Sequence, residues 1–129
     1  MVGDNTETEN RTRKVTEGPS LSDDQLYRAL SSTKRRRVLY ILLVEEETTI
    51  EKIATVLSGW DATETGKMVS PDEREQILIE LDHIHFPLLA KAGLVTYDRQ
   101  ERAVRIEPVS DTITDLICQS VETELPSSP

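Results

Sequence analysis

The sequence predicts a single, mainly α-helical domain that carries one small β-hairpin. Three observations lead to this prediction. Helix-start signals recur along the chain, and two short alternating segments between residues 94 and 106 are separated by a polar turn. The length of 129 residues, with 36% hydrophobic and 4% aromatic residues, supplies one modest core built mainly from Leu, Ile and Val.

The first two helices are predicted between residues 22 and 44. Residues 22–25 have the pattern of a capping box, which begins a helix that ends near Ser31. A second helix is expected to begin at Ser32 or Thr33. Its apolar residues cover much of its circumference, so this helix should lie at the centre of the domain. These residues are Val38, Leu39, Ile41, Leu42 and Leu43.

The third helix is predicted to begin at Thr48, which forms a second capping box with Glu51. Apolar residues then repeat at helical spacing as far as Leu57. Residues 58–69 contain two glycines and the single tryptophan, Trp60. We expect them to form a connector in place of the tight turn of an ordinary helix-turn-helix.

Residues 70–73, Ser-Pro-Asp-Glu, give the strongest helix start in the chain, because they combine a cap, an early proline and two acids near the positive dipole end. The fourth helix runs to Gly93, and Pro87 inside it should kink it or interrupt its hydrogen bonding. Its apolar side consists of Ile77, Leu78, Leu81, Ile84, Leu88 and Leu89.

Two strands and a last helix complete the order. Residues 94–97 and 103–106 alternate as strands around a polar turn, and Ser110 begins a helix with one apolar face. Three helices followed by a longer one and a two-stranded wing form the plan of a winged-helix domain, with the fourth helix in the position of the recognition helix. The expected organisation is a disordered tail (1–19), a winged-helix domain (20–108), a C-terminal helix (109–122) and a second disordered tail (123–129).

Composition limits the possible functions. The chain has 24 Asp and Glu residues against 15 Lys and Arg residues, and its formal net charge is -9. A surface this acidic repels nucleic acid on average, and it fits either a protein that avoids polyanions or one from a salt-rich cytoplasm, where an acidic, well-hydrated surface is normal. The single cysteine, Cys118, excludes an intrachain disulfide or a cysteine zinc site. The longest apolar run, residues 38–44, is too short to span a bilayer, so the expected location is cytoplasmic.

Two segments resemble known regulators. Residues 26–39 resemble the first two helices of ArsR-like winged-helix regulators, and residues 88–95 are similar to the end of their recognition helix. A group of haloarchaeal winged-helix domains of unknown function is more similar still. The shared segments are 70–74, 83–93 and 97–98. The resemblance covers roughly residues 21 to 107; it implies the fold, a regulator type of function, and acidity that reflects adaptation to salt.

The candidate DNA contacts are basic residues on two elements. Lys34, Arg35, Arg36 and Arg37 lie at a helix start, where cations oppose the dipole, so phosphate contact is one use for them. The alternative is a solvated network with nearby acids (Asp23, Asp24 and Glu45–Glu47). The wing offers Arg99, Arg102 and Arg105 for backbone or minor-groove contact, unless the neighbouring acids Asp98, Glu101 and Glu107 balance them.

The fourth helix is a poor reader of DNA bases. Residues 71–91 hold five acids and two bases, a net of 5 − 2 = 3 negative charges. Gln76 on its outward face could bond a base edge, whereas Ile79 and Phe86 would be exposed apolar groups that favour a protein surface.

His83 and His85 point about 200° apart on a helix, so no metal site is expected. No cofactor loop or nucleophile–base pair is recognisable, and we expect no enzymatic activity.

The sequence therefore leaves two main functional hypotheses and a weaker third, a ligand- or metal-responsive sensor of the ArsR kind, for which the needed cysteine pair is missing. The first is a DNA-binding regulator that uses the basic segment and the wing. The second is a protein-interaction module that uses Ile79, Phe86 and the region around Trp60. In either case we expect a homodimer through the apolar stripe of the last helix, with packing of that stripe on Leu26 and Leu30 of the first helix as the alternative. The stripe consists of Ile113, Leu116, Ile117 and Val121.

Overall fold

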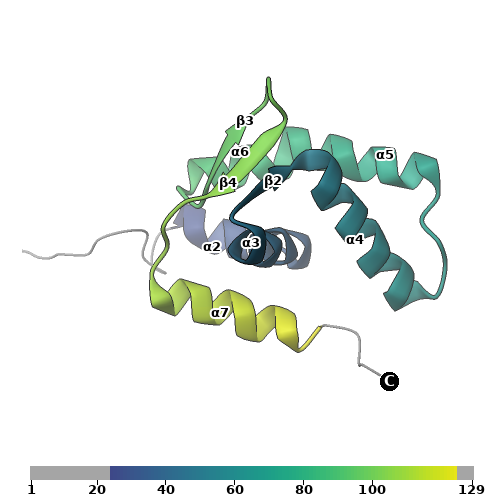
Figure 1. The fold of residues 1–129 in the computed structure, drawn as a ribbon. Helices are drawn as coiled ribbons and strands as arrows, with labels where there is room; N and C mark the ends of the chain where they lie inside the picture. The colour runs from purple at the N-terminus through teal and green to yellow at the C-terminus, as the bar shows by residue number, and fades with distance from the viewer. Residues whose placement is uncertain (1–23, 125–129) are drawn as a thin grey trace, which may run out of the picture.

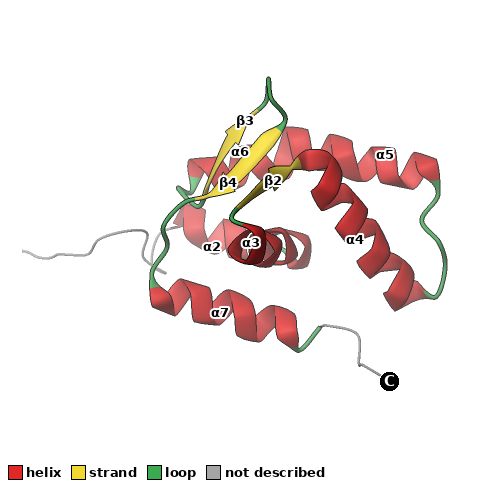
Figure 2. Cartoon of the chain, viewed as in Figure 1, coloured by secondary structure: helices red, strands yellow, loops and turns green. Residues whose placement is uncertain are grey.

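A computed structural model describes residues 24–124 as helices packed around a small antiparallel sheet (Figure 1; Figure 2). The elements are α2 (Asp24–Leu30), α3 (Thr33–Glu45), β2 (Glu47–Thr49), α4 (Ile50–Thr65), α5 (Pro71–Glu80), the π-helical segment η1 (Leu81–His85), α6 (Phe86–Lys91), β3 (Val95–Asp98), β4 (Ala103–Ile106) and α7 (Asp111–Glu122). This confirms the predicted mainly helical fold, which is compatible with a winged helix. The predicted tail 1–19, the helix start at 22–23 and residues 125–129 lie outside the described residues.

The sheet has three strands in the order β2-β4-β3, where the sequence predicts two. The hairpin of β3 and β4 is confirmed, with Val95 opposite Ile106. The added strand β2 pairs with β4 and places Glu47 opposite Arg105. A strand of three residues has no measurable period, and pairing with a distant segment is what makes these residues a strand.

The structure corrects the predicted third helix at both ends. Its N-cap is Thr49, whose hydroxyl accepts a hydrogen bond from the Lys52 N–H, and Thr48 lies in β2. The helix continues to Thr65, so most of the expected connector is helical. Gly59 does not end the helix, because one glycine costs only about 1 kcal/mol against alanine. The helix ends at Gly66, whose φ of 74° suits a left-handed cap.

The helical run from α5 to α6 matches the expected start and the expected interruption. The Ser70 hydroxyl and the Glu73 carboxylate form the predicted capping box. Before Pro87 the helix widens into η1, where the Phe86 N–H donates to the carbonyl of Leu81. A π-helical turn of this kind accommodates a proline, which has no N–H to donate and crowds the preceding turn.

Helix α7 completes the core instead of leaving an apolar stripe for a second subunit. Figure 1 shows α7 alongside the central helix α3, and Ile113, Ile117 and Val121 are buried there. The stripe packs mainly on α3, in the same core cluster as Leu26 and Leu30 of α2, the residues that the alternative named. Leu116 is the member of the stripe that stays exposed, at 40%. The expectation of a free stripe is wrong because α3 is apolar on this side as well.

Candidate functional site

The basic segment at the start of α3 lies inside the domain. Arg35 and Arg37 are 9% and 6% exposed, and Lys34 and Arg36 are half-buried. Four cations that were predicted as a phosphate-binding patch are therefore not presented as an open surface. Each has partners within the chain.

Arg35 and Arg36 cap the preceding helix. The Arg35 guanidinium donates from Nε to the carbonyl of Ala29 at 3.0 Å and from Nη2 to that of Arg28 at 2.7 Å. Arg36 donates from Nη1 to the carbonyl of Leu30 at 2.7 Å. These carbonyls belong to the last turn of α2, where no N–H follows at i+4 within the helix. The Arg28 carbonyl also accepts from the N–H and the hydroxyl of Ser31. The two arginines thus satisfy the end of one helix from the start of the next.

Arg35 also meets His85 from the π-helical segment. Its Nη1 lies 3.3 Å from Nδ1 of His85, which accepts the hydrogen bond when the ring is neutral. Burial, followed by the charges of Arg35 and Lys34, lowers the pKa of His85 to about 4. Its neutral ring therefore forms part of the contact between α3 and η1. His83 is exposed, as the sequence predicts.

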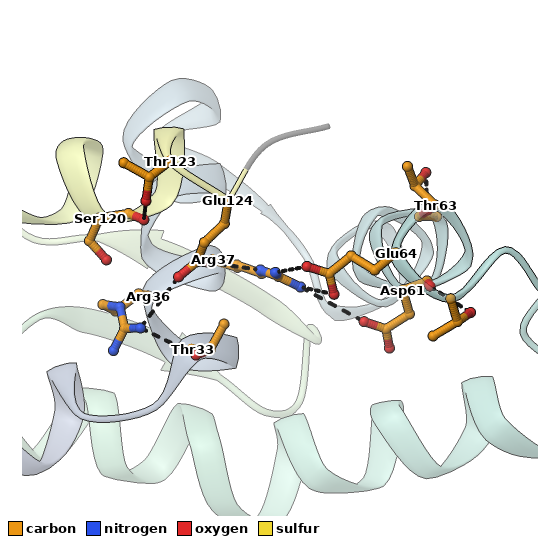
Figure 3. A network of polar contacts seen from close by, with 11 residues as sticks. Thr33, Arg36, Arg37, Asp61, Thr63, Glu64, Ser120, Thr123 and Glu124 are labelled. Carbon is orange, nitrogen blue, oxygen red and sulfur yellow. Dashed lines mark hydrogen bonds and ion pairs between the residues drawn. The ribbon is translucent and has the colours of Figure 1, made fainter. Parts of the chain in front are cut away.

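Arg37 joins three helices (Figure 3). Its guanidinium forms two hydrogen bonds to Glu64 of α4 and one from Nε to Glu124, just after α7, at 3.3 Å. Asp61 lies 3.9 Å away, and the guanidinium carbon is 4.5 Å from the ring centroid of Trp60. Burial alone lowers the pKa of Arg37, but Glu64 and Glu124 outweigh it and raise it overall. Arg37 therefore has a structural role, and its planar guanidinium bonds both carboxylate oxygens of Glu64.

The basic segment pairs with other acids than Asp24 and Glu45–Glu47 of the predicted solvated network, and Asp23 lies outside the described residues. Lys34 pairs with Glu80 of α5 at 3.6 Å, and Arg36 with Glu124 at 3.5 Å. Among the described residues, the partners of the basic segment come from α4, α5 and the end of α7, not from Asp24 or from residues 45–47. Sequence proximity identified the wrong acids, because the pairing is tertiary.

The wing arginines are paired with acids but remain accessible. Arg99 donates to a carboxylate oxygen of Asp82 at 3.1 Å, Arg102 pairs with Glu51, and Arg105 lies 3.7 Å from Glu107. Their side chains are 61%, 49% and 57% exposed. Of the acids that the sequence suggested, only Glu107 pairs with a wing arginine within residues 24–124, and the other two partners come from α4 and η1.

The outward face of the run from α5 to α6 differs from the prediction at two positions: Phe86 is buried, and Ile84, predicted on the apolar side, is 51% exposed. Gln76 is exposed and bonds Glu80 at 3.3 Å, and Ile79 is 43% exposed. Phe86, predicted as an exposed interaction residue, is fully buried, with its ring centroid 4.7 Å from that of Tyr97. The π-helical turn shifts the register of the residues after it, so a count at ordinary helical spacing misplaces Phe86.

Asp82 and Tyr97 fix the wing to the helical run. The Tyr97 hydroxyl donates to Asp82 at 2.7 Å, and this bond, with the charge of Arg99, lowers the pKa of the carboxyl. Burial and the same bond raise the pKa of Tyr97 to about 12.

Within residues 24–124 no group of three or more His, Cys, Asp or Glu side chains could hold a metal ion.

An apolar groove between α3 and α4 was missed at the sequence level. It has a volume of about 400 Å³ and is lined by Tyr40, Ile41, Val44, Glu45, Val56, Gly59, Trp60 and Thr63. Val44 and Val56 on its walls are 65% and 45% exposed. The signal that could have found it is the spacing of Val56 and Trp60, one helical turn apart. It becomes visible once α4 is extended through the supposed connector.

Comparison with known proteins gives one match. The model of the family "Domain of unknown function (DUF7344)" matches residues 27–105, from α2 to the last strand of the sheet. No curated protein and no solved structure matches the chain. None of the described helices has both the length and the apolar character needed to cross a membrane. The match spans more than half of the 129 residues, and the chain belongs to this family of domains of unknown function.

Proposed function

We propose that the domain is a non-enzymatic, winged-helix-like interaction module that recognises a protein partner and does not read DNA sequence. The observation that carries this proposal is the position of residues 34–37. Phosphate contact needs exposed cations that can release counterions. Here the four cations of the basic segment hold α2, α4, α5 and the end of α7 together.

The helix in the recognition position supports the same proposal. Its first turn exposes Asp72 and Glu73, and Glu75 is exposed one turn further on. Carboxylates facing the major groove are repelled by the phosphates on both sides. Ile79 on the same helix is a better contact for a protein surface than for a base edge.

The carboxyl groups of Glu51 and Glu64, whose pKa values are lowered, have structural roles, which agrees with the proposed non-enzymatic function. A hydrogen bond from Arg102 lowers the pKa of Glu51, and one from Arg37 lowers that of Glu64. Both side chains are thereby held as ion-pair acceptors. A general acid or base needs a pKa near the working pH, and these shifts run the other way.

A second candidate function is contact with DNA backbone through the wing. The observation that favours it is the exposure of Arg99, Arg102 and Arg105, about half or more in each case. Exposed ion pairs contribute only about 0–1 kcal/mol, so these arginines can exchange their carboxylates for phosphates at low cost. Such contact would be independent of sequence.

Binding of a fluorescent DNA duplex at several salt concentrations separates the two functions. For a protein-recognition module, we expect the same weak affinity for the parent and for the triple variant Arg99→Ala, Arg102→Ala, Arg105→Ala. A photoreactive amino acid placed at Ile79 or at Val56 in the host should crosslink to protein. Crosslinks to nucleic acid alone, together with loss of DNA affinity in the triple variant, would refute the proposal in favour of the second candidate.

A further inference from the structure

The walls of the α3–α4 groove are apolar and open. Val44 projects from α3 and Val56 from α4, and both are substantially exposed, whereas Ile41 and Trp60 between them are 8% exposed. Two adjacent helices with exposed valines on either side of a buried floor form the type of groove that receives an amphipathic helix.

Gly59 is the first indication that the groove receives a partner from outside the domain. It lies in the middle of the 16-residue helix α4, where glycine is about 1 kcal/mol less favourable than alanine. A Cβ built there would meet no atom within 4 Å, and its backbone does not have positive φ. Neither packing nor conformation within the described chain requires a glycine. Close approach of a backbone from outside the domain is the remaining physical use.

The run of acids that begins with Glu45 of the groove is the second indication. Glu45, Glu46 and Glu47 follow one another at the C-terminal end of α3, where negative charge opposes the helix dipole. Glu45 lines the groove, whereas Glu46 and Glu47 line neighbouring hollows that Arg105 also lines. Within residues 24–124 no cation lies within ion-pair distance of any of the three. Glu46 also has a φ of 70°, which is strained for a residue with a side chain.

We propose that this groove binds an amphipathic helix of a partner protein, with apolar residues against Val44 and Val56 and Lys or Arg residues beside Glu45–Glu47. This inference rests on the proposed interaction function and names the chemistry of the partner. A second copy of the chain fits poorly, because a two-fold contact would bring two acidic runs into one interface of a protein with net charge -9. DNA and anionic membranes are repelled by the same glutamates.

The test uses two synthetic helical peptides of about 14 residues, roughly four turns. They share one Leu stripe at i, i+3, i+4 and i+7 and differ in having Lys or Glu on the flanks. Titration is followed by the NMR signals of the Val44 and Val56 methyl groups and by the fluorescence of Trp60. We expect the Lys peptide to bind at least about tenfold more tightly than the Glu peptide. The double variant Glu45→Lys, Glu47→Lys should reverse that order.

Gly59→Leu is the decisive variant, because Gly59 lines the groove, its Cβ would meet no atom within 4 Å, and the rest of the leucine side chain would occupy the groove. We expect it to keep the parent's thermal transition and to weaken the Lys peptide by at least about tenfold. Ile84→Asp, at a 51% exposed position of η1, is the matched control and should leave the peptide affinity unchanged. Equal binding of the two peptides, or full affinity in Gly59→Leu, overturns the groove assignment. Loss of host protein crosslinks in Ile79→Asp but not in Gly59→Leu would also overturn it while leaving the interaction function standing.

Discussion

The two ends of α3 use their charged side chains in different ways. At the N-terminal end, Lys34 to Arg37 all find acceptors on neighbouring elements, and Arg35 and Arg37 are buried with them. At the C-terminal end, Glu45–Glu47 have no described ion-pair partner and lie beside exposed Val44. Within one helix, a run of charge is structural where tertiary partners surround it and available where they do not. The predictions below test this difference, beginning with the largest effect.

Removing α7 should abolish folding, because it exposes the part of the hydrophobic core that α7 covers. A chain that ends at Pro108 loses the burial of Ile113, Ile117 and Val121, each worth about 1.5–3 kcal/mol, and it also loses Glu124. The sum is comparable with the whole stability of a small domain. We expect no cooperative thermal transition by circular dichroism. Leu116→Ser on the exposed side of α7 is the control, and a cooperative transition in the shortened chain would contradict the prediction.

Arg37→Ala should cost about 3 kcal/mol, because it leaves Glu64 and Glu124 facing an empty site and removes the stacking on Trp60. Arg37→Lys should recover part of the loss, since one ammonium cannot reproduce the two parallel bonds to Glu64. Urea denaturation at constant slope measures both changes.

Val44→Ser, at the other end of α3, is the comparison for Arg37→Ala. Its side chain is 65% exposed, so we expect a change within about 0.5 kcal/mol. If Arg37→Ala and Val44→Ser had the same denaturation midpoint, the two ends of α3 would not differ energetically in the way the structure indicates.

Acid should destabilise the domain through His85. Its pKa is about 4 in the folded protein and near 6.5 when unfolded, so the unfolded state takes up the proton first as pH falls. The stability is complete above pH 6.5 and is lost as pH falls toward 4, by about 2–3 kcal/mol in all. Between pH 6.5 and 5, His85→Gln should remove the slope of unfolding free energy against pH. His83→Gln, at an exposed position, should retain the slope, and a loss in both variants would exclude His85 as its source.

The sequence predicted those features that depend on local chemistry. The caps at Ser32, Ser70 and Ser110 lie where expected, because a side-chain oxygen and a nearby N–H decide them within one turn. The strand β2 and the partners of Arg37 depend on segments that are distant in sequence, so no local pattern contains them. Phe86 was misplaced by a one-residue change of helical register, and the groove was missed because α4 was ended at the first glycine-containing stretch.

The last prediction is a small gain of stability at Gly59, which lines the groove beside the C-terminal end of α3. Gly59→Ala should stabilise the domain by about 0.5–1 kcal/mol, because alanine loses less backbone entropy in a helix and its methyl group meets no atom within 4 Å. Gly66→Ala is the matched control, because the φ of 74° at Gly66 is strained for any side chain and the same substitution should destabilise there. Denaturation midpoints at unchanged slope measure both. A destabilised Gly59→Ala would show that the glycine serves the fold itself. A stabilised variant that also binds the Lys peptide less tightly would show that the domain gives up helix stability at this position in exchange for a binding surface.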